Sequence, residues 1–171
     1  MAASARARRS APAPEATGKI CLWLRNEAGR RGVPVLRSFE RWLGAIPELR
    51  KRRDWAELNI LIVGTASGRR FNREFRGRDY ATNVLSFPYE PLPGEHSGLL
   101  GDLVICAPVV AREAREQRKI ARDHFAHMTI HGVLHLLGYD HETARDAEQM
   151  EALERRVLAS LGIADPYTVR D

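Results

Sequence analysis

Three histidines fall within eleven residues in the stretch His131-Gly132-Val-Leu-His135-Leu-Leu-Gly138-Tyr-Asp-His141. Two histidines four positions apart lie about 40° apart around an α-helix, so both imidazoles leave the same face. Gly138 readily ends a helix, because glycine can adopt the left-handed conformation. The chain then turns back and brings His141 toward the pair. The spacing therefore predicts three imidazoles around one divalent ion, with one position of a tetrahedral zinc left for water or substrate.

The segment that carries the first two histidines reads as a buried helix. Residues 122–137 are apolar on nearly every side except the histidine face, which is typical of a helix inside the protein. His127, one turn earlier, extends the polar stripe. A single histidine on such a helix is usually a core residue with a hydrogen bond to backbone, but three with this spacing and a glycine break favour a metal site. We interpret His127 as a residue that supports a ligand or lines the cleft.

The spacing His-x3-His-x2-Gly-x2-His is also that of the metzincin zinc proteases, with one difference. Position 132 is glycine, where the proteases carry the glutamate that acts as general base. Three neutral imidazoles leave zinc its full charge, which lowers the pKa of a bound water from about 15.7 toward about 7. Hydrolysis of an amide still needs a proton for its leaving nitrogen, whereas phosphodiester cleavage needs charge stabilisation, which a metal and arginine supply. The sequence therefore favours phosphodiester over peptide chemistry.

Asp140 directly precedes His141 and has two interpretations. It could orient a ligand imidazole or accept a proton during the reaction. It could equally be a turn residue that binds its own backbone.

Composition sets broader limits. The chain has 171 residues, enough for one domain, and its net charge of +5 favours a polyanionic partner such as nucleic acid. Two distant cysteines without a Cys-x-x-Cys pair fit a reducing compartment. We find no run of about 20 apolar residues and no secretory signal, so the predicted location is the cytoplasm and no membrane partner is expected. Residues 1–17 are predicted to form a disordered basic tail, and 18–171 a single domain.

Hydropathy patterns predict an α+β fold, with a small mixed four-stranded sheet, about five helices and a zincin-like histidine helix. Thr65 or Ser67 is expected to cap the second helix and Gly77 to end it, while Thr143 with Asp146 forms a capping box for the last. Arg50-Lys-Arg-Arg53 is expected in a loop, as solvated surface or as a phosphate-contacting patch. The expected strands are 20–24, 58–63, 83–87 and 103–106, and the expected helices are 35–43, 65–75, 108–118, 122–137 and 143–161.

Three blocks of sequence resemble the YbeY endoribonuclease family of ribosomal RNA maturation factors. Arginines 76 and 78 on their own would be read as surface charge. The resemblance covers about residues 19–168, including Asp165-Pro-Tyr167 near the end. The blocks are Arg76-Gly-Arg-Asp-Tyr-Ala-Thr-Asn-Val-Leu-Ser-Phe-Pro88, Leu100-Gly-Asp-Leu-Val-Ile105 and His131-Gly-x-Leu-His-Leu-x-Gly-Tyr-Asp-His141.

The resemblance implies a bacterial, cytoplasmic enzyme that binds one Zn²⁺ through His131, His135 and His141. Family members are single-strand-specific endoribonucleases that mature ribosomal RNA, notably the 3′ end of 16S, and act in ribosome quality control. The important arginine of the family corresponds to Arg76. Asp102 would lie at a strand end that borders the cleft, or serve structural hydrogen bonding. The implied partners are ribosomal RNA, the small ribosomal subunit and ribosome-associated proteins.

We therefore predict a zinc-dependent endoribonuclease with Arg76 and Asp140 as catalytic residues. The alternative is a non-catalytic ribosome-assembly factor with a structural zinc, closed by a fourth ligand such as His127 or Asp140. A third and weaker alternative is a metallohydrolase that acts on another phosphoester or on an amide.

Overall fold

The computed structural model describes residues 20–52, 54–95 and 97–168. The predicted disorder of residues 1–17 lies outside these ranges. A single domain over 18–171 stays a prediction.

Four strands form one mixed sheet in the order β1-β2-β4-β3. The strands β1 (Ile20–Asn26), β2 (Ala56–Val63) and β4 (Leu99–Cys106) run parallel to one another. The short strand β3 (Val84–Pro88) pairs antiparallel with β4 and forms one edge of the sheet. The predicted α+β fold with a small mixed four-stranded sheet is therefore confirmed.

The described ranges contain six helices, one more than expected. The additional helix, α2, has only four residues and begins at a proline, too short for a hydrophobic period. Arg50 ends this helix, so the prediction of a loop at Arg50 was wrong. None of the helices in the described part of the chain has the length and hydropathy that crossing a bilayer requires. Their bounds are α1 (Leu36–Gly44), α2 (Pro47–Arg50), α3 (Thr65–Arg76), α4 (Ala107–Glu116), α5 (Ala121–Leu136) and α6 (Ala144–Ser160).

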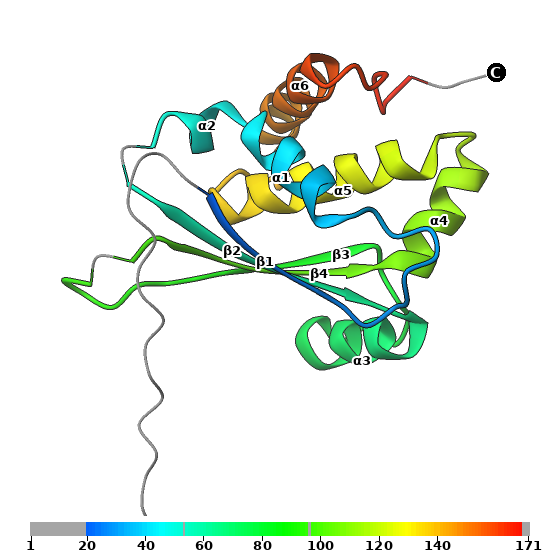
Figure 1. The fold of residues 1–171 in the computed structure, drawn as a ribbon. Coiled ribbons are helices and arrows are strands. Elements are labelled where there is room, and N and C mark those ends of the chain that lie inside the picture. The colour runs from blue at the N-terminus through cyan, green and yellow to red at the C-terminus, as the bar shows by residue number, and fades with distance from the viewer. Residues whose placement is uncertain (1–19, 53, 96, 169–171) are drawn as a thin grey trace, which may run out of the picture.

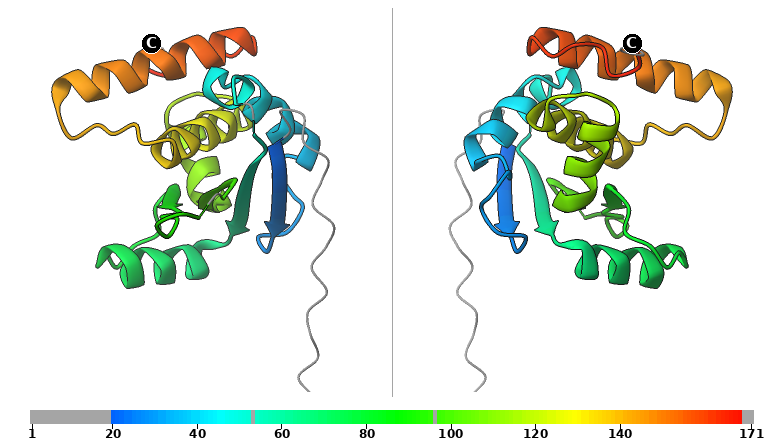
Figure 2. Two further views of the ribbon diagram at one scale, coloured as in Figure 1. Left: turned by 90° about the vertical axis from the view of Figure 1, so that its left-hand side faces the viewer. Right: turned by 90° about the vertical axis from the view of Figure 1, so that its right-hand side faces the viewer.

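The helices cover the two faces of the sheet unequally. Helices α1 and α5 pack on one face, with α6 against α5, while α3 lies on the other face (Figures 1 and 2). Alternation along β4 serves both sides, because Leu103 and Ile105 belong to the large core with α5, whereas Val104 and Cys106 belong to a smaller core on the side of α3. The histidine helix α5 is thus held between the sheet and α6. Both cysteines are free thiols.

Helix ends follow the sequence with one exception. Gly77 ends α3 with φ +66°, and the Thr143 hydroxyl accepts the Asp146 backbone N–H at 3.2 Å at the start of α6. The expected side-chain cap of α3 was wrong, since Gly64 occupies the cap position and Thr65 is already helical. The predicted end of α3 at Gly77 and the predicted start of α6 at Thr143 are therefore confirmed.

Candidate metal centre

Helix α5 approaches the sheet most closely at Gly132. A Cβ atom at this position would lie 2.9 Å from Cδ2 of Leu103 and 3.2 Å from Cγ2 of Val84, closer than side chains normally pack. The Ser86 hydroxyl donates a hydrogen bond to the Gly132 carbonyl at 3.2 Å. Packing against β3 and β4 therefore favours glycine at the position where zinc proteases carry their glutamate, and it places the neighbouring His131 close to the edge strand.

The turn after α5 brings the third histidine back toward the helix. Gly138 has φ +93°, its N–H binds the His135 carbonyl, and the Tyr139 N–H binds the Leu134 carbonyl, both at 3.0 Å. These two bonds form a Schellman motif, which reverses the chain at the helix end. His141 follows three residues later, as the sequence predicted.

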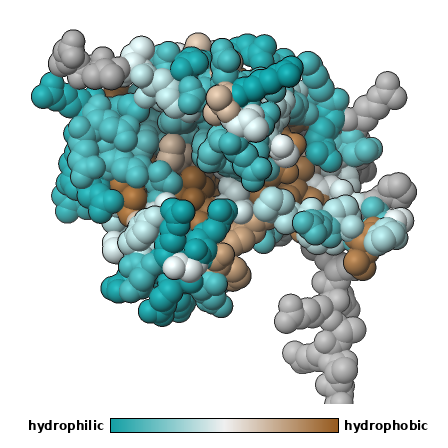
Figure 3. All heavy atoms as spheres, turned by 180° about the vertical axis from the view of Figure 1, so that it is seen from behind, coloured by the Kyte–Doolittle hydropathy of each residue, from teal (hydrophilic) through white to brown (hydrophobic). Residues whose placement is uncertain are grey.

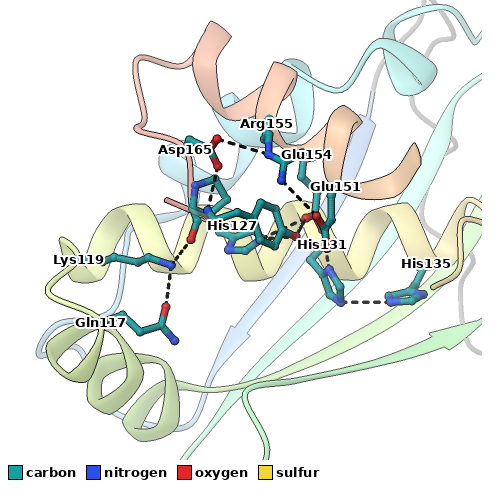
Figure 4. A network of polar contacts seen from close by, with 11 residues as sticks. Gln117, Lys119, His127, His131, His135, Glu151, Glu154, Arg155 and Asp165 are labelled. Carbon is teal, nitrogen blue, oxygen red and sulfur yellow. Dashed lines mark hydrogen bonds and ion pairs between the residues drawn. The ribbon is translucent and has the colours of Figure 1, made fainter. Parts of the chain in front are cut away.

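The three predicted ligands lie together. One ring nitrogen from each of His131, His135 and His141 lies within 4.8 Å of the other two. The Nε2 atoms of His131 and His135 are 3.2 Å apart, and Figure 4 shows these two rings side by side below α5. Two imidazoles on a tetrahedral zinc, with Zn–N bonds of about 2.0–2.1 Å, have their nitrogens about 3.3 Å apart. The residues therefore fit a zinc ion.

A cleft of about 750 Å³ opens beside the three imidazoles. His131, His135 and His141 line it from α5 and the following turn, and Arg76 and Arg78 line it from the end of α3. Seen from behind, the molecule is hollowed between α3 and the helical layer, with hydrophobic residues exposed in the hollow (Figure 3). The structure thus brings the predicted Arg76 to the same cleft as the candidate metal ligands.

Asp140 lines the same cleft but is engaged with its own turn. Its Oδ1 atom accepts the backbone N–H of His141 at 2.7 Å and lies 4.0 Å from the Nδ1 atom of that ring. The turn interpretation is therefore satisfied. A role in proton transfer stays a prediction.

The electrostatics of the cleft favour a neutral imidazole at His135. Burial lowers the pKa of His135, and the neighbouring charges of His131 and His141 lower it further. A neutral imidazole has the free lone pair that a metal ligand needs. His135 is therefore prepared to bind a cation near neutral pH.

Two other predicted residues lie elsewhere. His127 is buried and does not line the cleft, and its Nε2 atom lies 3.2 Å from Oε2 of Glu154. Lining of the cleft is therefore excluded for His127, and a role in supporting a ligand stays a prediction. Asp102 lies in a separate groove on the side of α3, where its Oδ1 atom accepts a hydrogen bond from the Asn59 amide at 2.7 Å. Of the two interpretations of Asp102, only structural hydrogen bonding agrees with this position.

The sequence analysis missed Glu154 of α6. Its side chain is fully buried, and its Oε1 atom lies 2.6 Å from Nδ1 of His131. Burial alone would raise the pKa of this carboxyl group, but hydrogen bonds from His127, His131 and Tyr167 lower it to about 2. One sequence signal could have revealed it: Glu154 lies three or four positions from Met150 and Val157, inside the apolar stripe of its helix.

Fold and site together define a class of protein: a small α+β protein with a three-histidine candidate metal centre in an arginine-lined cleft. The sequence of residues 27–162 matches the family described as Endoribonuclease YbeY. The chain belongs to this family.

Individual relatives agree with that assignment. The chain is 59% identical over 142 residues to "Endoribonuclease YbeY" of Alkalilimnicola ehrlichii, covering 82% of this chain and 86% of the relative. It is 63% identical over 118 residues to the protein of that name from Bordetella avium, covering 68% and 71%. Among solved structures, it resembles the solution structure of TM1509 from Thermotoga maritima, with a TM-score of 0.55 and 26% identity over 87% of this chain and 99% of the other.

Proposed function

We propose that this protein is a zinc-dependent endoribonuclease that cuts single-stranded RNA during ribosomal RNA maturation, notably at the 3′ end of 16S, and in ribosome quality control. Membership of a family named for endoribonuclease activity supports RNA cleavage. The observation that carries the zinc part is the convergence of three imidazole nitrogens within 4.8 Å beside a cleft with two arginines. The proposal includes the cytoplasm as its location, with the small ribosomal subunit and ribosome-associated proteins as partners.

In this proposal, different residues of the cleft bind the metal ion, bind the phosphate and accept a proton. His131, His135 and His141 hold the ion, which when bound supplies positive charge that polarises an oxygen and stabilises charge on a phosphoryl group. Arg76, which lines the same cleft, binds a phosphate oxygen and orients the backbone of the RNA. Asp140, on the turn beside His141, is proposed to accept a proton.

The structural-zinc alternative has less support. Structural zinc sites are usually closed by four protein ligands. Among the described residues the histidine group has three members, and the two residues considered as a fourth are engaged elsewhere. His127 faces Glu154, and Asp140 binds the backbone of His141.

The His135→Ala variant tests the site itself. We expect RNA cleavage by the purified protein to fall below detection, because the ion loses one of three protein ligands. Bound zinc is measured alongside cleavage of single-stranded and ribosomal RNA, with a peptide mixture and a ribosome-binding assay as further arms. Wild-type protein with stoichiometric zinc and no ribonuclease activity would contradict the proposal and favour the assembly-factor alternative.

The Arg76→Glu variant separates substrate binding from metal binding. Removing a donor that stabilises developing charge costs about 10²–10³ in rate, so we expect a loss of that order with zinc content near wild type. Arg70→Glu is the matched control, because Arg70 lies on the same helix but does not line the cleft. Equal losses in both variants would show a general charge effect.

A further inference from the structure

A buried carboxylate on α6 contacts the first of the three histidines from behind. Glu154 has no exposed surface, and each of its oxygens faces donors. Oε1 lies 2.6 Å from Nδ1 of His131, while Oε2 lies 3.2 Å from Nε2 of His127 and accepts the hydroxyl of Tyr167. Figure 4 shows Glu154 above the ring of His131, on the side away from His135. A buried charge is stable only with such partners.

The same three groups, His127, His131 and Glu154, could also be considered as a second metal site. The distances decide against it. A nitrogen and an oxygen that share a tetrahedral zinc lie about 3.3 Å apart, whereas Nδ1 of His131 and Oε1 of Glu154 are 2.6 Å apart. This is the length of a direct, charge-assisted hydrogen bond.

That hydrogen bond determines which ring nitrogen of His131 is free. An ionised carboxylate only accepts, so Nδ1 of His131 carries the proton. In a neutral ring the lone pair is then on Nε2, the atom 3.2 Å from Nε2 of His135. A carboxylate behind a ligand histidine fixes its tautomer and orientation and increases its basicity.

Glu154 is itself held by the C-terminal segment. The Tyr167 hydroxyl donates to Glu154, and the guanidinium of Arg155 lies 4.8 Å from the centre of the Tyr167 ring. Arg155 also pairs with Asp165 at 3.4 Å, and the Asp165 side chain accepts the backbone N–H of Tyr167 at 2.9 Å. The turn at 165–167 therefore positions the Tyr167 hydroxyl against the Glu154 carboxylate, and this carboxylate in turn binds His131.

We propose that Glu154 is a positioning residue of the metal centre, which fixes His131 with Nε2 directed at the ion, and that Tyr167 holds Glu154 in place. This inference rests on the three-histidine site of the proposed function. It adds two residues, on α6 and in the C-terminal segment, that act on the ion only through His131.

The test compares Glu154→Gln with Glu113→Gln in the full-length protein. Glu113 of α4 makes the same kind of hydrogen bond to His124. His124 lies on α5, as His131 does, but is not one of the three proposed ligands. We expect zinc affinity, measured by competition with a chelator, to fall about 10–100-fold in Glu154→Gln, as for other residues that support a metal ligand. In Glu113→Gln it should stay within twofold of wild type.

A second readout reports the tautomer directly. In the zinc-free wild-type protein, ¹⁵N NMR of the His131 ring should show a protonated Nδ1 and an unprotonated Nε2. The Glu154→Gln variant should show a mixture of tautomers, while Glu113→Gln keeps the wild-type pattern. Unchanged zinc affinity together with an unchanged His131 spectrum in folded Glu154→Gln would overturn the proposal.

Tyr167→Phe provides a milder variant in case Glu154→Gln does not fold. It removes one donor to Glu154, and we expect zinc affinity to fall several-fold. The control is Tyr89→Phe, which removes a hydroxyl bond to the exposed Glu95. Equal zinc affinity in the two tyrosine variants would also count against positioning by Glu154. Wild-type protein that binds no zinc would instead refute the metal centre itself, so the two failures are distinct.

Discussion

Helix α5 carries two imidazole–carboxylate pairs that look alike and differ in consequence. Near its start, His124 pairs through Nε2 with Glu113 of α4 at 2.8 Å. Near its end, His131 pairs through Nδ1 with Glu154 of α6 at 2.6 Å. Both pairs join α5 to a neighbouring helix, and in both the carboxylate accepts a hydrogen bond from an N–H of the ring.

The difference lies in which ring nitrogen the carboxylate uses. His124 commits Nε2, at the tip of the ring, and its remaining Nδ1 is buried without a partner among the described residues. His131 commits Nδ1, next to its Cβ, and directs the tip into the cleft beside His135. An imidazole–carboxylate pair is therefore structural when the carboxylate binds Nε2. When the carboxylate binds Nδ1, Nε2 stays free to coordinate a metal ion.

The largest expected effect is on stabilisation by zinc, which should differ between His131→Ala and His124→Ala. A ligand at 100 times its dissociation constant stabilises the folded state by about 2.7 kcal/mol. We expect zinc at that ratio to stabilise wild-type protein and His124→Ala by this amount, and His131→Ala hardly at all. Denaturant unfolding with and without zinc measures the difference. Zinc stabilisation that survives in His131→Ala would remove the proposed distinction between the two pairs.

A smaller effect is expected from Gly132→Ala, which disturbs only the His131 end of the helix. The added methyl group would press on Leu103 and Val84, and overpacking of this kind costs about 1–3 kcal/mol. Gly44→Ala is the control, because a Cβ at Gly44 meets nothing within 4 Å and alanine favours a helix. Urea unfolding of both variants tests this, and equal stability would show that the sheet yields easily at Gly132.

The smallest effect concerns the acid sensitivity of the structural pair. Burial alone would raise the pKa of Glu113, but hydrogen bonds from His124 and Asn83 hold it below its usual value of 4.5. The unfolded chain therefore binds a proton that the folded one does not, so the free energy of unfolding decreases as pH falls below about 4.5. Glu113→Gln should lose less stability than wild type between pH 5 and pH 3. A decrease of equal steepness in both proteins would contradict this assignment.

Local sequence patterns were sufficient for the fold and for the three candidate ligands. Histidines four apart on a helix share a face by geometry alone, and Gly138 marks the reversal that returns His141. Alternating and helical hydropathy likewise located all four strands and the five longer helices. These signals need only a few neighbouring residues, so they can be read without knowing the tertiary structure.

Tertiary contacts could not be read in this way. Glu154 reaches His131 from 23 residues further along the chain, and Tyr167, which binds Glu154, lies 36 residues beyond His131. No local period links either residue to His131. The role of Gly132 in packing depends on Val84 and Leu103 across the sheet. Asp102 was misplaced for the same reason, because the face of a strand that meets a cleft depends on which helix covers it.

The close contact at Gly132 also limits what this scaffold can become. The Cβ of a glutamate there would press against side-chain atoms of Leu103 and Val84 in the sheet. A general base at this position therefore requires these side chains or the helix to shift, although the histidine spacing is the same as in the peptidases. A change toward proteolysis would therefore involve repacking between α5 and the sheet as well as a new residue at position 132.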